Sequence, residues 1–264
     1  MTLILAVCAV WLLVRPGTAM DAVSAACRLF VTGVMPGLLP YMTVTLMLVS
    51  RLHRPLRPWQ LVLMGWCGGS PCGARLLREA GNIRHGRRIA AACATMSPMF
   101  LAGTLGRWLD SPRAGTCILI AGISGGLAAA ALAGGDAAPA GQTAPPARLS
   151  LGQAVENTAR TLLTVCGIMA LMRLAAALAA ELVPAALVIT TLLEVTSGAE
   201  IIAGLPLPLP MRTAIIAGAT GFGGASLLMQ NRAVIQLFSL PEQIALQAVH
   251  GAVSFLVALG LMLL

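Results

Sequence analysis

The sequence contains no lysine and has few charged or aromatic residues. Charged residues make up 10% and aromatic residues 4% of the 264 positions, whereas 58% are hydrophobic and the mean hydropathy is +0.88. A soluble domain of this length needs far more charge to cover its surface, so the composition excludes a water-soluble globular protein. It predicts an all-α, polytopic integral membrane helix bundle that is embedded in the lipid bilayer.

Sequence signatures of the common enzyme and metal-site classes are also missing. No paired-carboxylate motif, HExxH, GxSxG or phosphate-cradling glycine loop occurs, and a hydrolase pair of Ser70 or Ser97 with His250 has no supporting spacing. The seven cysteines are scattered through apolar segments, and the close pair Cys67 and Cys72 has no neighbouring His or carboxylate. We therefore expect a protein that is not an enzyme and has no metal or cofactor.

The charge that is present is unbalanced. Seventeen basic residues, all arginine, face nine acidic ones, for a net charge of +8. In a membrane protein, arginine in short loops marks the cytoplasmic side, and the scarcity of stacking aromatics argues against a nucleic-acid partner. Two basic loops, residues 51–58 and 78–88, are therefore expected on the cytoplasmic side of the cell membrane.

Apolar segments divide the chain into two membrane halves. Residues 134–149 (GGDAAPAGQTAPPARL) have almost nothing to bury, which predicts a flexible linker between an N-terminal half, 1–133, and a C-terminal half, 150–264. Residues 2–14 lack a basic start and a cleavage site, so we expect a retained span and not a signal peptide. Further spans are expected at residues 21–49, 89–109, 114–133, 153–180, 183–205 and 244–264.

Residues 59–77 are long enough to cross a membrane, but their middle reads CGGSPCG. Because basic loops flank this stretch at both ends, the positive-inside rule favours a re-entrant hairpin with a Pro-Gly tip. The alternative is a single kinked span with one basic loop outside.

Gly and Pro interrupt other apolar stretches too, at residues 36–40, at Ser97–Pro98 and at residues 221–224. Prolines 36 and 40 should kink or unwind their helix. The similarity of CGGSPCGARLL to GFGGASLL indicates a weak internal two-fold repeat, as in many transporters. Helix breaks in a bilayer expose amides and carbonyls that can bind a polar solute or an ion.

Glu194 stands near the middle of its expected span, where an unpaired charge is costly. We expect either a site residue compensated by Thr196, Ser197, a solute or a proton, or a structural ion pair with Arg173. The breaks at 68–73 and 221–224 are predicted to meet near the membrane midplane, because each leaves backbone groups that need partners. The expected hydrogen-bonding side chains are Ser70, Ser97, Glu194, Ser226 and Gln230.

The order of these motifs, MPGLLPYM, CGGSPCGARLL, MSPMFLAGTLG, LLEVTSG and GFGGASLLMQ, resembles the sporulation integral membrane proteins of the YlbJ type. These belong to the Gate, or nucleoside-recognition, family, and the likeness extends from the N-terminal span to Gln230. More distantly, the pattern is similar to concentrative nucleoside transporters. The family hallmarks fall on Pro36, Pro40, Gly69, Pro71, Gly73, Ser97, Pro98, Glu194, Gly198, Gly223, Gly224 and Gln230.

The resemblance implies a transporter-like protein with a site for a small, nucleoside-like solute in a sporulation-related membrane. The alternative is a non-transporting membrane factor for spore cortex or envelope assembly, which acts through a second copy of the chain or through sporulation membrane proteins. The candidate substrate-binding residues are Gly69, Ser70, Pro71, Gly73, Ser97, Pro98, Glu194, Thr196, Gly198, Gly223, Gly224, Ser226 and Gln230.

Overall fold

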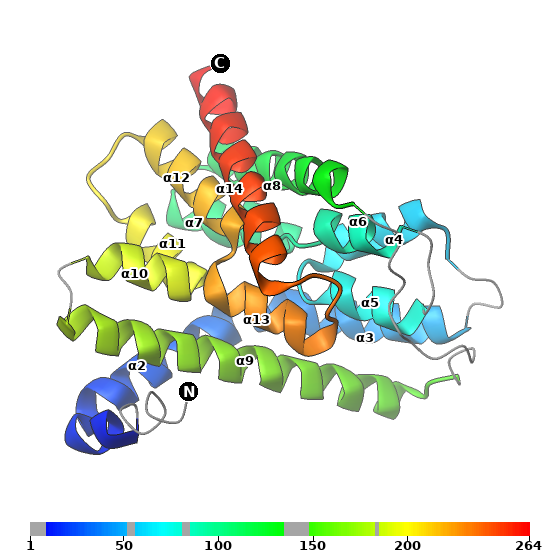
Figure 1. Ribbon diagram of the computed structural model, residues 1–264, viewed down its shortest axis with the longest axis horizontal. Helices are drawn as coiled ribbons and strands as arrows, with labels where there is room; N and C mark the ends of the chain where they lie inside the picture. The colour runs from blue at the N-terminus through cyan, green and yellow to red at the C-terminus, as the bar shows by residue number, and fades with distance from the viewer. Residues whose placement is uncertain (1–8, 52–55, 81–84, 135–147, 183–184) are drawn as a thin grey trace.

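A computed structural model describes residues 9–51, 56–80, 85–134, 148–182 and 185–264. Within these residues all regular secondary structure is helical and no strand occurs, which confirms the all-α prediction (Figure 1). Four helices of the described chain are long and apolar enough to cross a membrane: Pro16–Arg51, Pro112–Leu132, Leu151–Leu182 and Leu240–Leu263. The protein therefore has the helices expected of an integral membrane protein.

The first long helix is continuous and does not unwind at its prolines. It consists of α2 (Pro16–Leu29), a π-helical segment η1 (Phe30–Val34) and α3 (Met35–Arg51). The irregularity expected at residues 36–40 lies instead at η1, one turn earlier. In a regular helix the Pro36 ring would clash with the carbonyl of residue 32, and the wider π turn accommodates that ring.

The next apolar stretch forms two shorter helices, α4 (Pro58–Gly68) and α5 (Cys72–Ala80). Residues 89–109, expected as a span with an interruption at Ser97–Pro98, are also divided. They comprise most of α6 (Gly86–Ala92), a non-helical segment at residues 94–97, η2 (Met99–Thr104) and α7 (Leu105–Trp108). Pro98 begins the second part because it lacks an amide hydrogen for a continuing helix. The long helix α8 (Pro112–Leu132) completes the first half.

The second half begins with α9 (Leu151–Leu182) and α10 (Ala186–Leu193). Residues 183–205 were expected as one span, but α10 ends before Glu194 and α11 (Val195–Ala203) begins after it. Glu194 has an extended backbone and caps α11, so a helix starts at the predicted centre of the span. The remaining helices are α12 (Leu209–Phe222), α13 (Gly224–Val234) and α14 (Leu240–Leu263).

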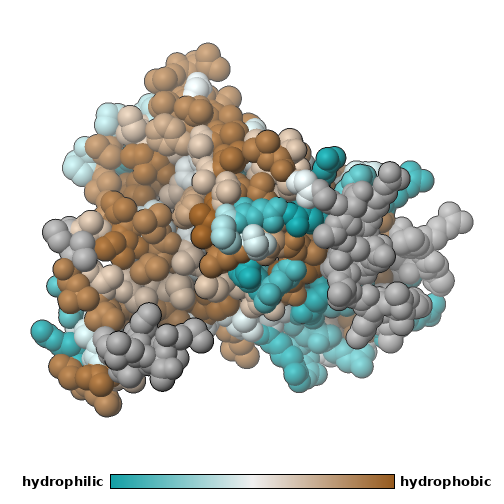
Figure 2. Space-filling model, in the orientation of Figure 1, coloured by the Kyte–Doolittle hydropathy of each residue, from teal (hydrophilic) through white to brown (hydrophobic). Residues whose placement is uncertain are grey.

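The two halves of the sequence share their hydrophobic cores. Helix α8 packs against α12 and α14, and one core contains Ile118, Val195 and Ile216 together. Helix α9 contacts α2, α3 and α10 along the opposite side of the molecule (Figure 1). Figure 2 shows a largely hydrophobic surface over α10, α12 and α14, whereas hydrophilic residues gather around α13 and the start of α9.

Candidate functional site

The break between α4 and α5 packs directly against the break after α6. The Ser70 amide donates a hydrogen bond to the Thr95 carbonyl, with an N···O distance of 2.6 Å. Gly69 has φ of +66°, and a Cβ atom built on it would lie 2.2 Å from the backbone nitrogen of Ser97. Only glycine permits both this conformation and this approach. The hydrogen bond between the two interruptions therefore satisfies a backbone donor of one and a backbone acceptor of the other.

The breaks of the second half meet in the same way. Helix α12 ends at Gly223 in the left-handed conformation, and α13 begins at Gly224 with φ of +62°. A Cβ atom on Gly224 would lie 2.9 Å from the carbonyl oxygen of Leu192, in the last turn of α10. Gly198 packs equally closely against Thr191. The glycines thus let α11 and α13 start side by side against the end of α10.

Glu194 is completely buried and its carboxylate binds backbone amides. Its Oε1 and Oε2 atoms accept hydrogen bonds from the amides of Thr196 (3.1 Å) and Ser197 (2.6 Å). The positive end of the α11 dipole stabilises the same charge. The alternative pairing with Arg173 is not seen: the Glu194 carboxylate binds these two amides, no ion pair joins it to Arg173 among the described residues, and Arg173 Nη1 is buried without a hydrogen-bond partner. The groups that compensate the buried Glu194 carboxylate are therefore the amides of residues 196 and 197.

An inner cavity of about 30 Å³ lies where these helix starts converge. Such a volume holds one or two water molecules. The polar groups around it come from the predicted site, and none of the lining residues is charged. The cavity is lined by Ser70, Ser97, Thr196, Ser226 and Gln230, together with Val34, Leu38, Met96, Phe100, Val165, Met169 and Leu227.

The polar lining residues share a position relative to their helices. Ser70 precedes the start of α5, Ser97 precedes η2, Thr196 is in the first turn of α11 and Ser226 is in the first turn of α13. Helix N-termini carry partial positive charge, although the Ser70, Thr196 and Ser197 amides are already bonded to the Thr95 carbonyl and the Glu194 carboxylate. The cavity therefore favours the acceptor atoms of a small solute or water.

The other predicted site residues lie around this cavity and do not line it. Glu194 and Gly198 shape the start of α11, and Gly69, Gly223 and Gly224 shape the close backbone contacts. Gly73 packs α5 against Cys93, Pro98 precedes η2, and Pro71 lines a separate, arginine-rich pocket.

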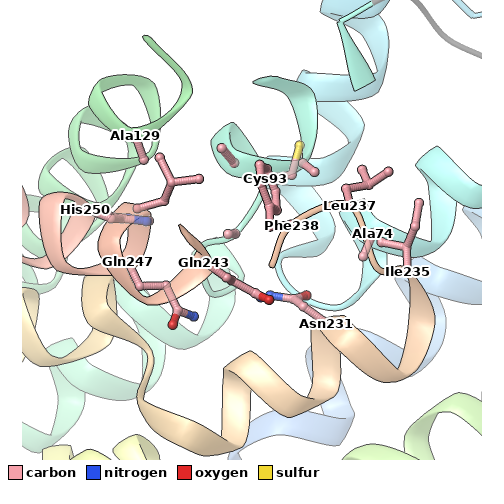
Figure 3. Close-up of a pocket in the computed structure, with 14 residues that line it drawn as sticks. Ala74, Cys93, Ala129, Asn231, Ile235, Leu237, Phe238, Gln243, Gln247 and His250 are labelled. Atoms are coloured by element: carbon pink, nitrogen blue, oxygen red, sulfur yellow. The ribbon is translucent and has the colours of Figure 1, made fainter. Parts of the chain in front are cut away.

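A second cavity lies next to the inner cavity, and a hydrogen bond joins a residue that lines one to a residue that lines the other. Ser70 lines the inner cavity and its hydroxyl donates to Asn231 Oδ1, whereas Asn231 lines an amide-rich cavity of about 40 Å³. Figure 3 shows the Asn231 and Gln243 side chains pointing toward each other across this space. His250 bonds through Nε2 to the Gly122 carbonyl oxygen at 2.9 Å. Gln247 Oε1 is buried there without a partner.

Sequence reasoning did not select Asn231, Gln243 and Gln247. Asn231 directly follows the selected Gln230, and an amide in an apolar helix is a signal that could have found it. The two glutamines of α14 gave a weaker signal, since their facing residues lie on helices remote in sequence. No group of three or more His, Cys, Asp or Glu that could hold a metal gathers within the described ranges.

We expect the Ser70–Asn231 bond to couple α5 and α13 energetically. In a double-mutant cycle of Ser70→Ala and Asn231→Ala, the coupling free energy should be about 1 kcal/mol, because both groups are buried. Thermal unfolding of detergent-purified protein measures it. Additive effects would show that the bond does not contribute to stability.

Comparisons of this chain with protein-family models, curated proteins and solved structures found no match.

Proposed function

We propose that this chain is a multi-pass membrane protein of the Gate type that admits a small polar solute to the inner cavity. The observation that supports this most is the convergence of four helix starts, those of α5, η2, α11 and α13, on one uncharged polar space. Such junctions of discontinuous helices are where transporters bind solutes. The motif order resembling YlbJ-type sporulation proteins agrees with this proposal.

In this proposal, α4 and α5 form a re-entrant hairpin, and the glycine-bearing pair α12 and α13 is its counterpart in a two-fold repeat. The end of α3, the start of α4 and the end of α5 lie at one end of the molecule (Figure 1). The tips of the intervening basic loops, residues 52–55 and 81–84, lie outside the described residues.

Both basic loops should therefore be accessible from the same side of the membrane. Cysteine placed at Arg54 or at Arg84, in a background without native cysteines, should react with a membrane-impermeant thiol reagent only from the cytoplasmic side. Labelling of intact cells and of inverted vesicles compares the two sides. Accessibility from opposite sides would contradict the hairpin.

The size of the cavity constrains how a solute enters. About 30 Å³ admits water, whereas ligand pockets for larger organic molecules measure roughly 300–1,000 Å³. A nucleoside-like solute therefore requires the surrounding helices to separate. Transport by alternating access predicts that the cavity opens in turn to each side of the membrane.

Thiol labelling of Ser226→Cys in the cysteine-free background tests this opening. We expect slow modification by a small methanethiosulfonate reagent from both sides, because Ser226 lines the cavity. Ser254→Cys is the matched control: Ser254 is equally buried but lies outside the cavity and bonds to the Ala121 carbonyl. Protection of Ser226→Cys from both sides would contradict transport.

The tight packing of the cavity favours a second candidate, a membrane factor for spore cortex or envelope assembly that does not transport. Buried apolar residues such as Leu38, Met96 and Phe100 close the space around the polar groups. In that case the breaks would serve helix packing, and function would depend on protein partners. Protection of Ser226→Cys is the result that this candidate predicts.

A further inference from the structure

A third pocket, of about 260 Å³, lies between α5, α9 and α13 and is rich in arginine. The spacing of Asn157, Arg160, Thr161 and Thr164 places them on one face of α9, and Arg75 and Arg78 lie on one face of α5. We call this space the arginine pocket. Its polar lining residues are Arg75, Arg78, Asn157, Arg160, Thr161, Thr164 and Gln230.

Arg75 is the buried base of the arginine pocket and is only 8% exposed. Its Nη1 donates to the Asn157 carbonyl at 2.9 Å and to the Thr161 hydroxyl. Its Nε atom is buried and donates no hydrogen bond, and the nearest carboxylate oxygen, on Glu79, is 3.8 Å away. A buried guanidinium with an unused donor requires an acceptor, because unpaired buried donors are costly.

Arg78 and Arg160 stand at the rim of the arginine pocket with side chains 45% and 76% exposed. Their carboxylate neighbours are Glu79, at 3.9 Å from Arg78 Nη2, and Glu156, at 2.8 Å from Arg160 Nη2. Neither glutamate lines the pocket, so all the charged groups that line it are positive. Figure 2 shows the hydrophilic surface that surrounds the start of α9.

We propose that the arginine pocket binds a phosphate group. A phosphate monoester carries close to two negative charges and three terminal oxygens, so it can accept hydrogen bonds from several guanidinium groups at once, which a single carboxylate does less well. This site lies beyond the proposed function: it adjoins the inner cavity, with which it shares Val165 and Gln230, but it binds a different chemical group and does not depend on transport. The phosphate belongs either to a lipid headgroup or to a soluble phosphorylated compound.

Thermal unfolding of the detergent-purified full chain measures binding, since a ligand that binds the folded state raises the Tm. The probes are inorganic phosphate, dioctanoyl phosphatidic acid, dioctanoyl phosphatidylcholine, and acetate at equal ionic strength. The pocket variant is Arg78→Gln with Arg160→Gln. The control, Arg107→Gln with Arg113→Gln, removes the same charge from exposed positions outside the pocket.

We expect phosphate or phosphatidic acid to stabilise the wild type and the control, and the pocket variant to need at least about tenfold more ligand. Stabilisation by phosphatidic acid alone identifies a lipid headgroup, and stabilisation by inorganic phosphate identifies a soluble source. Arg160→Gln alone gives the same comparison if the double variant does not fold. The proposal is overturned if neither probe stabilises, if acetate or phosphatidylcholine is equally effective, or if both double variants weaken binding equally.

Discussion

Gly69→Ala is expected to destabilise the protein more than any other single methyl addition at the candidate site. The new Cβ would lie 2.2 Å from the Ser97 nitrogen and 2.7 Å from the carbonyl carbon of Met96, both backbone atoms that cannot rotate away. The backbone at Gly69, with φ of +66° and ψ of −174°, is also one that alanine rarely adopts. Strain and overpacking together should cost about 3 kcal/mol or more.

The measurement is thermal unfolding of the purified variant, with a decrease in Tm of roughly 10 °C expected. Gly103→Ala is a matched control from η2, because a Cβ on Gly103 meets nothing within 4 Å. The Gly103→Ala variant should therefore have nearly the same Tm as the wild type. Equal stability of the two variants would show that α5 and the segment before η2 are not packed against each other.

Glu194→Ala is expected to have the second largest effect, because it removes both acceptors of the α11 amides. The Thr196 and Ser197 amides would remain buried without partners, at a cost of about 2–4 kcal/mol. Glu194→Gln keeps one acceptor oxygen and should lose about half as much stability. We also expect Glu194→Gln to insert normally but to impair function, because the charge beside the inner cavity is gone.

Glu200→Gln provides the comparison for Glu194, because residue 200 is on the same helix but exposed. The unfolding temperature of each variant measures its effect on stability. The labelling rate of Ser226→Cys in the same variants measures the effect on the cavity. An unchanged Tm in Glu194→Ala would show that the cap does not stabilise α11. If Glu194→Gln fully complements a deletion of the protein, the role of Glu194 is only structural.

The hydropathy of the sequence was sufficient to predict the helical class and the long apolar helices. Residues 114–133 and 153–180 were expected as spans and correspond closely to α8 (Pro112–Leu132) and α9 (Leu151–Leu182). The reason is local: twenty apolar residues in succession are stable as a helix in lipid whatever they pack against. The small residues at 68–73 and 221–224 likewise coincide with the helix ends at Gly68 and Phe222, because Gly and Pro act on their own backbone.

Local signals were ambiguous where a side chain or a remote contact decides the backbone. Glu194 was expected either to be a site residue compensated by nearby groups or to pair with Arg173, and in the structure its carboxylate accepts hydrogen bonds from two α11 amides. Pro36 and Pro40 both lie within a continuous helix, and the preceding π turn accommodates the ring of Pro36. In both cases the sequence allows several conformations of similar cost, and packing selects one.

The sequence by itself determined that this chain is a helical membrane protein with polar residues at its interrupted stretches. Only the tertiary structure decided which of those residues meet: Ser70, Ser97, Thr196, Ser226 and Gln230 line one cavity, whereas Asn231 and Arg75 belong to neighbouring ones. Helix formation depends on neighbours a few residues away, so it can be deduced from composition and spacing. A cavity depends on the orientation of helices up to 160 residues apart, such as those that bring Ser226 close to Ser70, and side-chain packing alone sets that orientation.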